Sequence, residues 1–399
     1  MSTLHFRQFE VPEGTIDLGL GQPDPGVYPH ELLRRAAADV LADGRDPRLD
    51  YEFLQYGAEY GDRSHRIAVA RYLSTAYGCT VDPEHILTTN GNSQGLDLVC
   101  TVLAQPGDVV IVEEPTYFLA RGIFSDHGLT AVGVSSDEHG LDTEALADRL
   151  GELRRAGTPA RFVYCIPASQ NPTGATMPQV RRTRLLELAD EYDLLVVADE
   201  VYHLLHYAPD PPPLPFSAHV TTGRVVSLGT FSKILSPGLR LGWIHADSPL
   251  LARLVGSGVI TSGGGLNPFT SALVTSVIES GGLATNVAHL CSVYTRRLDT
   301  LLQALEHTMP PGATWHEPTG GYFVWVTLPD AIDTAVVRRL GRDEHVDIRQ
   351  GELFSTSGGL TSSLRLSFAH YSDDDLREGV SRLSRAIARA ASHPPVTSP

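Results

Sequence analysis

The strongest constraint on the fold is a regular alternation of short β-branched runs with helical patterns between about residues 80 and 245. Six such runs predict strands: Ile86–Thr89, Val109–Glu113, Leu129–Val134, Arg161–Ile166, Leu194–Asp199 and Arg224–Leu228. Helical patterns lie between them, for example at Gln94–Leu103, Thr143–Arg154 and Pro178–Tyr192. Alternating strands and helices form a mostly parallel sheet covered on both faces. We therefore predict a three-layer α/β sandwich with its ligands at the carboxyl ends of the strands.

The rest of the chain predicts a second, smaller unit. After Leu250 the pattern is helical through Val277 and again from Ala288 to His307. Three strands and a last helix follow: Tyr322–Leu328, Val346–Gln350, Ser363–Phe368 and Asp373–Ala391. A chain of 399 residues exceeds one ordinary domain. We predict a proline-rich, extended N-terminal arm (1–45) that joins the small domain, a large domain (46–285), a small α+β domain (286–391) and a disordered tail (392–399).

Composition excludes several classes of protein. The net charge of −16 argues against a nucleic-acid partner, because nothing in such a chain would neutralise phosphates. No apolar run reaches the roughly 18 residues that a membrane span needs, and the first residues lack the pattern of a secretory signal. The cysteines are far apart, which predicts reduced thiols in a cytoplasmic protein and no zinc site: Cys79, Cys100, Cys165 and Cys291.

A lysine with unusual neighbours follows one of the predicted strands. Thr230, Ser232 and Arg240 surround Lys233 in the segment Ser227–Trp243. Two hydroxyls and a guanidinium are suited to bind a dianionic phosphate. A lysine beside other cations has a lowered pKa and can attack a carbonyl. The alternative is a solvated surface lysine, which this spacing disfavours.

A carboxylate ends another predicted strand. Asp199 follows a fully apolar run, where an unpaired charge is costly. It could cap a helix, or it could pair with a pyridinium nitrogen and keep that nitrogen protonated, as pyridoxal 5′-phosphate (PLP) chemistry requires. Tyr202, three residues later, would lie on the same helical face and could donate its hydroxyl to the ring oxygen of PLP.

These residues, with several motifs, resemble the class I and II aminotransferases, PLP-dependent enzymes of fold type I. The motifs are Ser169–Gly174 (SQNPTG), Glu114–Tyr117 (EPTY), Asn90–Gly95 (NGNSQG) and Leu364–Phe368 (LRLSF). The resemblance implies that Lys233 holds PLP as a Schiff base. It also implies that Tyr117 stacks on the cofactor, that Asn171 faces its ring oxygen and the substrate carboxylate, that Asn92 and Ser93 lie at its phosphate, and that Arg365 binds the substrate α-carboxylate.

Two weaker matches bear on assembly and closure. Gly19–Asp24 resembles the arm that closes over the substrate, with Gly21 offering a backbone N–H. Leu54–Gly57 resembles a segment that reaches into a neighbouring subunit, where Tyr56 would touch the phosphate. The resemblance therefore implies a homodimer with shared active sites.

Two other features are set aside. His203 and His206 could suggest a metal pair, but no third ligand is near in the chain, so we interpret them as histidines on a helix face and predict no metal. Ser262–Gly265 lacks the strand and Lys-Ser/Thr of a phosphate loop, so we interpret it as a flexible break between helices near the dimer contact.

The leading hypothesis is an aminotransferase that moves an α-amino group from an amino acid to a 2-oxo acid. Other PLP reactions, such as elimination, replacement or C–C bond formation, begin in the same way and stay open. A non-catalytic ligand-binding module is a third possibility. The side chain of the substrate is not determined, because no second arginine can be assigned to a distal carboxylate.

Overall fold

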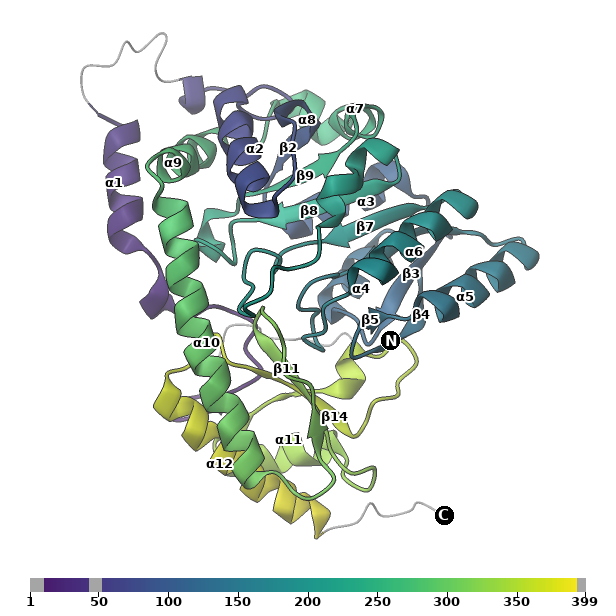
Figure 1. The fold of residues 1–399 in the computed structure, drawn as a ribbon, viewed down its shortest axis with the longest axis vertical. Coiled ribbons are helices and arrows are strands. Elements are labelled where there is room, and N and C mark those ends of the chain that lie inside the picture. Colours follow the sequence, from purple (N-terminus) through teal and green to yellow (C-terminus); the bar gives the residue numbers. More distant parts are fainter. Residues whose placement is uncertain (1–10, 43–51, 393–399) are drawn as a thin grey trace.

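A single eight-stranded sheet forms the larger part of the molecule (Figure 1). The computed structural model describes residues 11–42 and 52–392. In order across the sheet, the strands are β2 (Ile86–Thr89), β9 (Gly242–Ala246), β8 (Val225–Thr230), β7 (Leu195–Asp199), β6 (Ala160–Cys165), β3 (Val109–Glu114), β4 (Thr130–Asp137) and β5 (Gly140–Leu141). Strands β4, β3, β6, β7 and β8 are parallel, whereas β9 is antiparallel to both of its neighbours. The predicted mostly parallel sheet is confirmed.

Helices cover both faces of this sheet. They are α2 (Arg63–Tyr77), α3 (Asn92–Leu103), α4 (Phe118–Asp126), α5 (Thr143–Arg155), α6 (Gln179–Glu191), α7 (Ser248–Val255), α8 (Gly258–Gly263) and α9 (Pro268–Glu279). Along β3, Val110 and Val112 belong to the core beneath α3 and α4, whereas Ile111 belongs to the core beneath α5 and α6. Successive side chains of a strand point to opposite faces, so a continuous apolar run fills both layers.

A four-stranded antiparallel sheet forms the smaller part. Its order is β10 (Thr314–Trp315), β11 (Phe323–Thr327), β14 (Ser363–Ser367) and β13 (Arg349–Gln350). Three helices accompany it: α10 (Gly282–Thr308), α11 (Thr334–Asp343) and α12 (Asp373–Ala391). Short 3-10 turns lie at 25–27, 52–54, 83–85, 216–222, 237–239 and 351–354. The side chain of Ser372 accepts from the N–H of Asp375 at the start of α12, and three aspartates in its first turn favour the positive end of the helix.

The N-terminal arm divides between the two parts. Strand β1 (Ile16–Asp17) pairs in parallel with β12 (Val346–Asp347) beside the small sheet. The arm is not extended throughout, because α1 (His30–Val40) is a helix that packs on α9 (Figure 1). Its prolines precede the helix, where a fixed φ is tolerated. The start of the arm (1–10) and the tail (393–399) lie outside the described residues.

The predicted domain boundary after residue 285 lies in the first turns of α10, a helix that runs alongside both parts (Figure 1). The division into two domains therefore stays a proposal, with α10 shared between them. Of the helices in the described ranges, none has the length and apolar character that would let it cross a membrane.

Candidate active site

A cavity of about 710 Å³ opens where the carboxyl ends of the central strands meet the small sheet and the arm. Its wall contains residues from each of these: Gly21 of the arm, Asp199 at the end of β7, Thr230 at the end of β8, and Arg365 of β14. The predicted strand ends converge here because parallel strands finish at one edge of a sheet.

Lys233 places its amine in this cavity. Its Nζ donates to the carbonyl of Gly21 at 3.0 Å, and its own carbonyl accepts from the hydroxyl of Tyr322 at 2.9 Å. Burial and, after it, the positive charge of Arg365 lower the pKa of the Lys233 amine to about 8, against the opposing effect of Asp199. A minor but substantial fraction of the amine is therefore neutral near physiological pH, and this neutral form is the nucleophile.

Asp199 lines the cavity, and each of its two carboxylate oxygens accepts a hydrogen bond. The side-chain amide of Asn92 donates to Oδ1 at 2.6 Å, and the hydroxyl of Tyr164 donates to Oδ2 at 2.8 Å. Burial raises the pKa of this carboxyl to about 6, although both hydrogen bonds oppose the shift. The helix-cap alternative is wrong, because the chain after Asp199 forms turns and both oxygens bind side chains.

Tyr202 reaches the cavity from a turn and not from the predicted helix face. Its buried ring packs against Tyr322 and Phe323 at centroid distances of 5.2 and 6.0 Å. Burial raises the pKa of its hydroxyl, so this group stays a donor. Tyr117 also lines the cavity, and burial raises the pKa of its hydroxyl to about 12.

Arg365 is a buried guanidinium with neutral partners. It donates to Oδ1 of Asn171 at 2.8 Å and to the carbonyl of Gly19 at 2.7 Å. Its planar group lies 4.0 Å from the ring centroid of Phe323. Its Nε has no acceptor, and within residues 11–42 and 52–392 no carboxylate pairs with it. Burial and the charge of Arg349 lower the pKa of Arg365 to about 9.

The predicted phosphate ligands also line the cavity. Ser93 lies exposed in the first turn of α3, and Arg240 donates to the carbonyl of Asn90 at 3.2 Å. Thr230 and Ser232 are joined by a hydrogen bond of 3.0 Å between their hydroxyls. Gly91 has φ +81°, and a Cβ there would come within 3.0 Å of the Arg240 guanidinium. The glycine keeps the start of α3, which favours anions, open to a ligand.

Three residues considered from the sequence do not line the cavity. Tyr56 is 80% exposed, and its predicted contact with the phosphate of a neighbouring subunit stays a prediction. His203 and His206 are not on a helix: His203 packs edge-on against Tyr77, and His206 contacts the carbonyl of Asp210. No cluster in the described part of the chain could hold a metal.

The Ser262–Gly265 segment is also more constrained than predicted. The N–H of Gly265 donates to the carbonyl of Gly57 at 2.9 Å, and a Cβ at Gly265 would lie 1.8 Å from the carbonyl oxygen of Ala58. The glycines permit this close approach of two backbones, so the segment is a packed junction and not a free linker.

Four residues near the cavity were missed from the sequence. Tyr164 lies on β6 opposite Val197 of β7, so it faces the same side as Asp199, and this parity could have identified it. Arg349 enters the cavity wall and is paired with Asp17 of the arm. Glu113 lies beneath the Asn171 loop and accepts from the side chain of Gln170 at 3.2 Å. No local pattern marks Arg349, Asp17 or Glu113, because their partners are distant in the chain.

Comparison with known proteins gives a consistent result. Residues 15–383 match the family described as aminotransferase class I and II. The aromatic-amino-acid aminotransferase 1 of Thermococcus litoralis is 36% identical over 374 residues, which cover 93% of this chain and 88% of that protein.

Two solved structures are similar over almost the whole chain. The multiple substrate aminotransferase of Thermococcus profundus has a TM-score of 0.89 at 35% identity, covering 95% of this chain and 93% of that one. The kynurenine aminotransferase of Pyrococcus horikoshii, in complex with PMP, has a TM-score of 0.87 at 34% identity, covering 94% and 91%.

Proposed function

The chain belongs to the class I and II aminotransferases, PLP-dependent enzymes that move an amino group from an amino acid to a 2-oxo acid, and we propose how its own residues carry out this reaction. Lys233 is the proposed base and covalent anchor, Asp199 the partner of the pyridine nitrogen, and Arg365 the ligand of the substrate α-carboxylate. The observation that carries the proposal is the placement of this amine, this buried carboxylate and this unpaired guanidinium in one cavity.

The residues present fit PLP. Ser93, Thr230, Ser232 and Arg240, with the start of α3, would hold its phosphate, and Asp199 would hold the ring nitrogen. A buried carboxylate without a cationic partner is costly, and a protonated pyridine would supply that partner. When bound, PLP supplies a ring that withdraws electrons from the α-carbon of an attached amino acid.

Lys233 would move the proton. As a free amine, its Nζ would take the proton from the substrate α-carbon as a general base and would later give that proton up as a general acid. A base with a pKa near the working pH does this most efficiently, and the Lys233 pKa of about 8 is suitable.

The substrate would be oriented at its other end. Arg365 can donate two parallel hydrogen bonds to a carboxylate, and Asn171 lies beside it at 2.8 Å. Tyr117 would stack on the ring, and the buried hydroxyl of Tyr202 would donate to its oxygen. The arm residues Gly19 and Gly21, which contact Arg365 and Lys233, would exclude water from the reacting atoms.

The test is a single half-reaction. We expect the purified PLP-loaded enzyme, given one amino acid and no acceptor, to release one equivalent of the matching 2-oxo acid and to retain pyridoxamine phosphate. Mass spectrometry of both products checks this. Release of ammonia or carbon dioxide in place of that pair would favour the elimination or decarboxylation chemistry that the same residues could support.

We also propose that the enzyme is a homodimer and that it works in the cytoplasm. Several large apolar side chains are exposed near the phosphate end: Leu54, Tyr56, Val259 and Phe269. The Gly57–Gly265 bridge joins their segments, and Asn267 donates to the carbonyl of Arg240. A second copy could cover this surface and complete the phosphate site. The four free cysteines are consistent with a reducing compartment.

A further inference from the structure

We propose that this enzyme takes amino acids with a single carboxylate and an apolar side chain, and that Asp17 determines this specificity by neutralising a second arginine in the cavity. The proposal rests on the aminotransferase function above and adds its substrate class. It begins from Arg349, which lines the cavity together with Arg365.

The two arginines are direct neighbours. Arg349 and Arg365 are opposite each other in the antiparallel pair β13–β14, so their side chains leave the same face of the sheet. Like charges at opposite positions repel each other and require compensation. Two free guanidinium groups side by side would make a site for a dicarboxylate.

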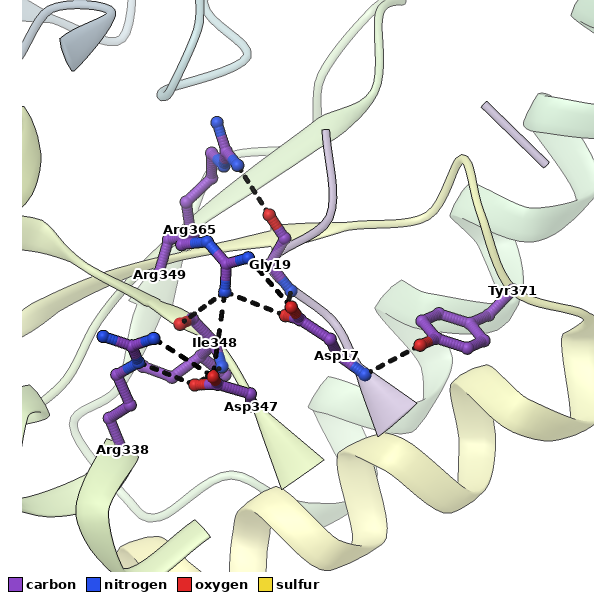
Figure 2. Close-up of polar contacts among 8 residues, drawn as sticks. All are labelled: Asp17, Gly19, Arg338, Asp347, Ile348, Arg349, Arg365 and Tyr371. Carbon is purple, nitrogen blue, oxygen red and sulfur yellow. Dashed lines mark hydrogen bonds and ion pairs between the residues drawn. The ribbon is translucent and has the colours of Figure 1, made fainter. Parts of the chain in front are cut away.

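Asp17 removes one of these two charges. Both of its carboxylate oxygens accept from Arg349, at 2.9 and 2.8 Å, and the two side chains are only 5% and 8% exposed (Figure 2). Behind them, Arg338 pairs with Asp347 at 2.7 Å. The formal charges of these four residues, two arginines and two aspartates, sum to zero.

The arm is built to hold this pair. The N–H of Asp17 donates to the hydroxyl of Tyr371, and Oδ1 of Asp17 accepts from the N–H of Gly19 (Figure 2). A Cβ at Gly19 would lie 2.7 Å from Cγ of Arg349, so the absence of a side chain lets the arm lie directly against this arginine. The Asp17–Arg349 ion pair is therefore a buried contact that the fold of the arm supports, and not an exposed surface pair.

Much of the remaining wall of the cavity is apolar. Leu20 of the arm and three residues of α4 also line the cavity: Phe118, Leu119 and Ile123. A second substrate carboxylate would be desolvated here without a free cation. An aromatic or branched aliphatic side chain would instead bury its surface favourably. Arg365 has no carboxylate partner among the described residues, which matches a single substrate α-carboxylate.

The experiment compares L-phenylalanine and L-leucine with L-glutamate. Wild type should prefer the apolar acids by about 100-fold or more in kcat/KM, because the unpaired carboxylate of glutamate is rejected. In Asp17→Asn, which frees Arg349, this preference should shrink by about tenfold or more. The double variant Asp17→Asn/Arg349→Gln removes both charges and should restore the wild-type preference.

A binding measurement supports the kinetics independently. Calorimetry with the PLP-loaded enzyme should show that wild type binds 3-phenylpropionate more tightly than glutarate, and that Asp17→Asn gains affinity for glutarate. Asp137→Asn is the matched control, because it removes the bidentate partner of Arg181, at 2.6 Å, away from the cavity. The control should leave both ligand preferences unchanged.

The possible outcomes separate the substrate class, the role of Asp17 and the aminotransferase function. Wild-type transfer from glutamate as fast as from phenylalanine would overturn the substrate class but leave the aminotransferase function intact. An equal loss for all substrates in Asp17→Asn, with the preference unchanged, would make Asp17 a tether of the arm and would overturn its role in specificity. Failure of wild type to transfer an amino group from any of the acids would instead contradict the proposed function.

Discussion

The amine of Lys233 lies among groups that remove it from water and oppose its positive charge. Burial and the nearby Arg365 and Arg240 all lower its pKa, and Asp199 compensates in part. An ordinary exposed lysine is almost fully protonated at neutral pH. The environment of this residue therefore determines when its amine can react.

Covalent attachment of PLP to Lys233 should follow this pKa. We expect the attachment rate in the cofactor-free enzyme to rise with pH and to level off above about pH 8, because the neutral amine is the nucleophile. Borohydride trapping followed by peptide mass spectrometry measures the rate. Lys233→Ala should trap nothing and transfer no amino group. A rate that keeps rising to pH 10 would show that the amine behaves as an exposed lysine.

Arg365 is predicted to discriminate acids from amines. Arg365→Ala should lose roughly 2–5 kcal/mol of transition-state stabilisation for an amino acid, mostly as a raised KM, because a buried carboxylate loses both hydrogen bonds. Arg365→Lys should recover little, since an ammonium group cannot donate two parallel bonds. The measurement is kcat/KM for an amino acid and for its decarboxylated amine. An unchanged ratio between them in Arg365→Ala would exclude the proposed carboxylate contact.

Tyr164 should set the proton affinity of Asp199. Its hydroxyl donates to Oδ2 of Asp199 and helps to keep the carboxyl ionised. Tyr164→Phe should move the acid limb of the kcat/KM profile upward by about one pH unit, since a charge-assisted hydrogen bond is lost. Tyr207→Phe is the control, because it removes a buried hydroxyl that donates to the Gly321 carbonyl. Coincident profiles for Tyr164→Phe and wild type would leave Tyr164 with a packing role alone.

At the scale of elements, the end of β3 supports the loop that carries Asn171. Glu113 accepts from the N–H of Ile166 and from the side chain of Gln170, whose carbonyl oxygen accepts in turn from Thr173. Burial raises the pKa of Glu113 to about 8, so the carboxyl is largely neutral at physiological pH. This buried hydrogen-bond network connects the large sheet to the Asn171 loop.

Glu113→Gln should make stability less dependent on pH. A carboxyl whose pKa is raised on folding holds its proton in the folded chain but releases it in the unfolded chain, so wild-type stability falls as the pH rises from about 4.5 to about 8. Glutamine cannot ionise and keeps an acceptor oxygen. The Tm advantage of Glu113→Gln over wild type should therefore grow between pH 5 and pH 8 in thermal melts. A difference that is constant over this range would contradict a protonated Glu113.

The elements that sequence could predict are those with a local pattern. The sequence predicts the strands between β2 and β8 that carry long apolar runs, because burial on both faces leaves a local signal. It also predicts the capped helices α5 and α12, because helix periodicity is a local signal. Strand β9 was missed because its residues follow the Lys233 loop and were included in it. Helix α1 was not predicted, because the prolines that precede it indicated an extended segment.

The same reasoning applies to the site. Lys233, Asp199 and Arg365 stand in motifs, so the chain order identifies them. The Asp17–Arg349 pair joins residues 332 positions apart, and a sequence offers no measure of that proximity. Tertiary contacts of this kind decide which arginine is free, and so they decide what the cavity can bind.

At the scale of the whole molecule, the residues proposed to bind the phosphate lie beside an exposed surface. Ser93 and Arg240 are exposed, and the segment of Tyr56 lies close by through the Gly57–Gly265 bridge without reaching the cavity. An open phosphate site beside an exposed apolar surface is what a shared dimer site would leave in a single chain. Light scattering of wild type should give the mass of a dimer.

Complementation between an inactive variant and a variant with weakened cofactor binding tests whether the sites are shared. Tyr56→Ala should weaken PLP retention by about tenfold, because a phosphate contact is lost, and Lys233→Ala should be inactive. In a mixed dimer, one site would combine the intact Lys233 of one chain with the intact Tyr56 of the other. Random exchange should then restore about one quarter of the wild-type sites at equal mixing. If Tyr56 served the site of its own chain, or none, mixing would restore nothing beyond the activity of Tyr56→Ala itself. Cofactor titration of the mixture against each parent distinguishes these results, because the restored sites bind PLP with wild-type affinity.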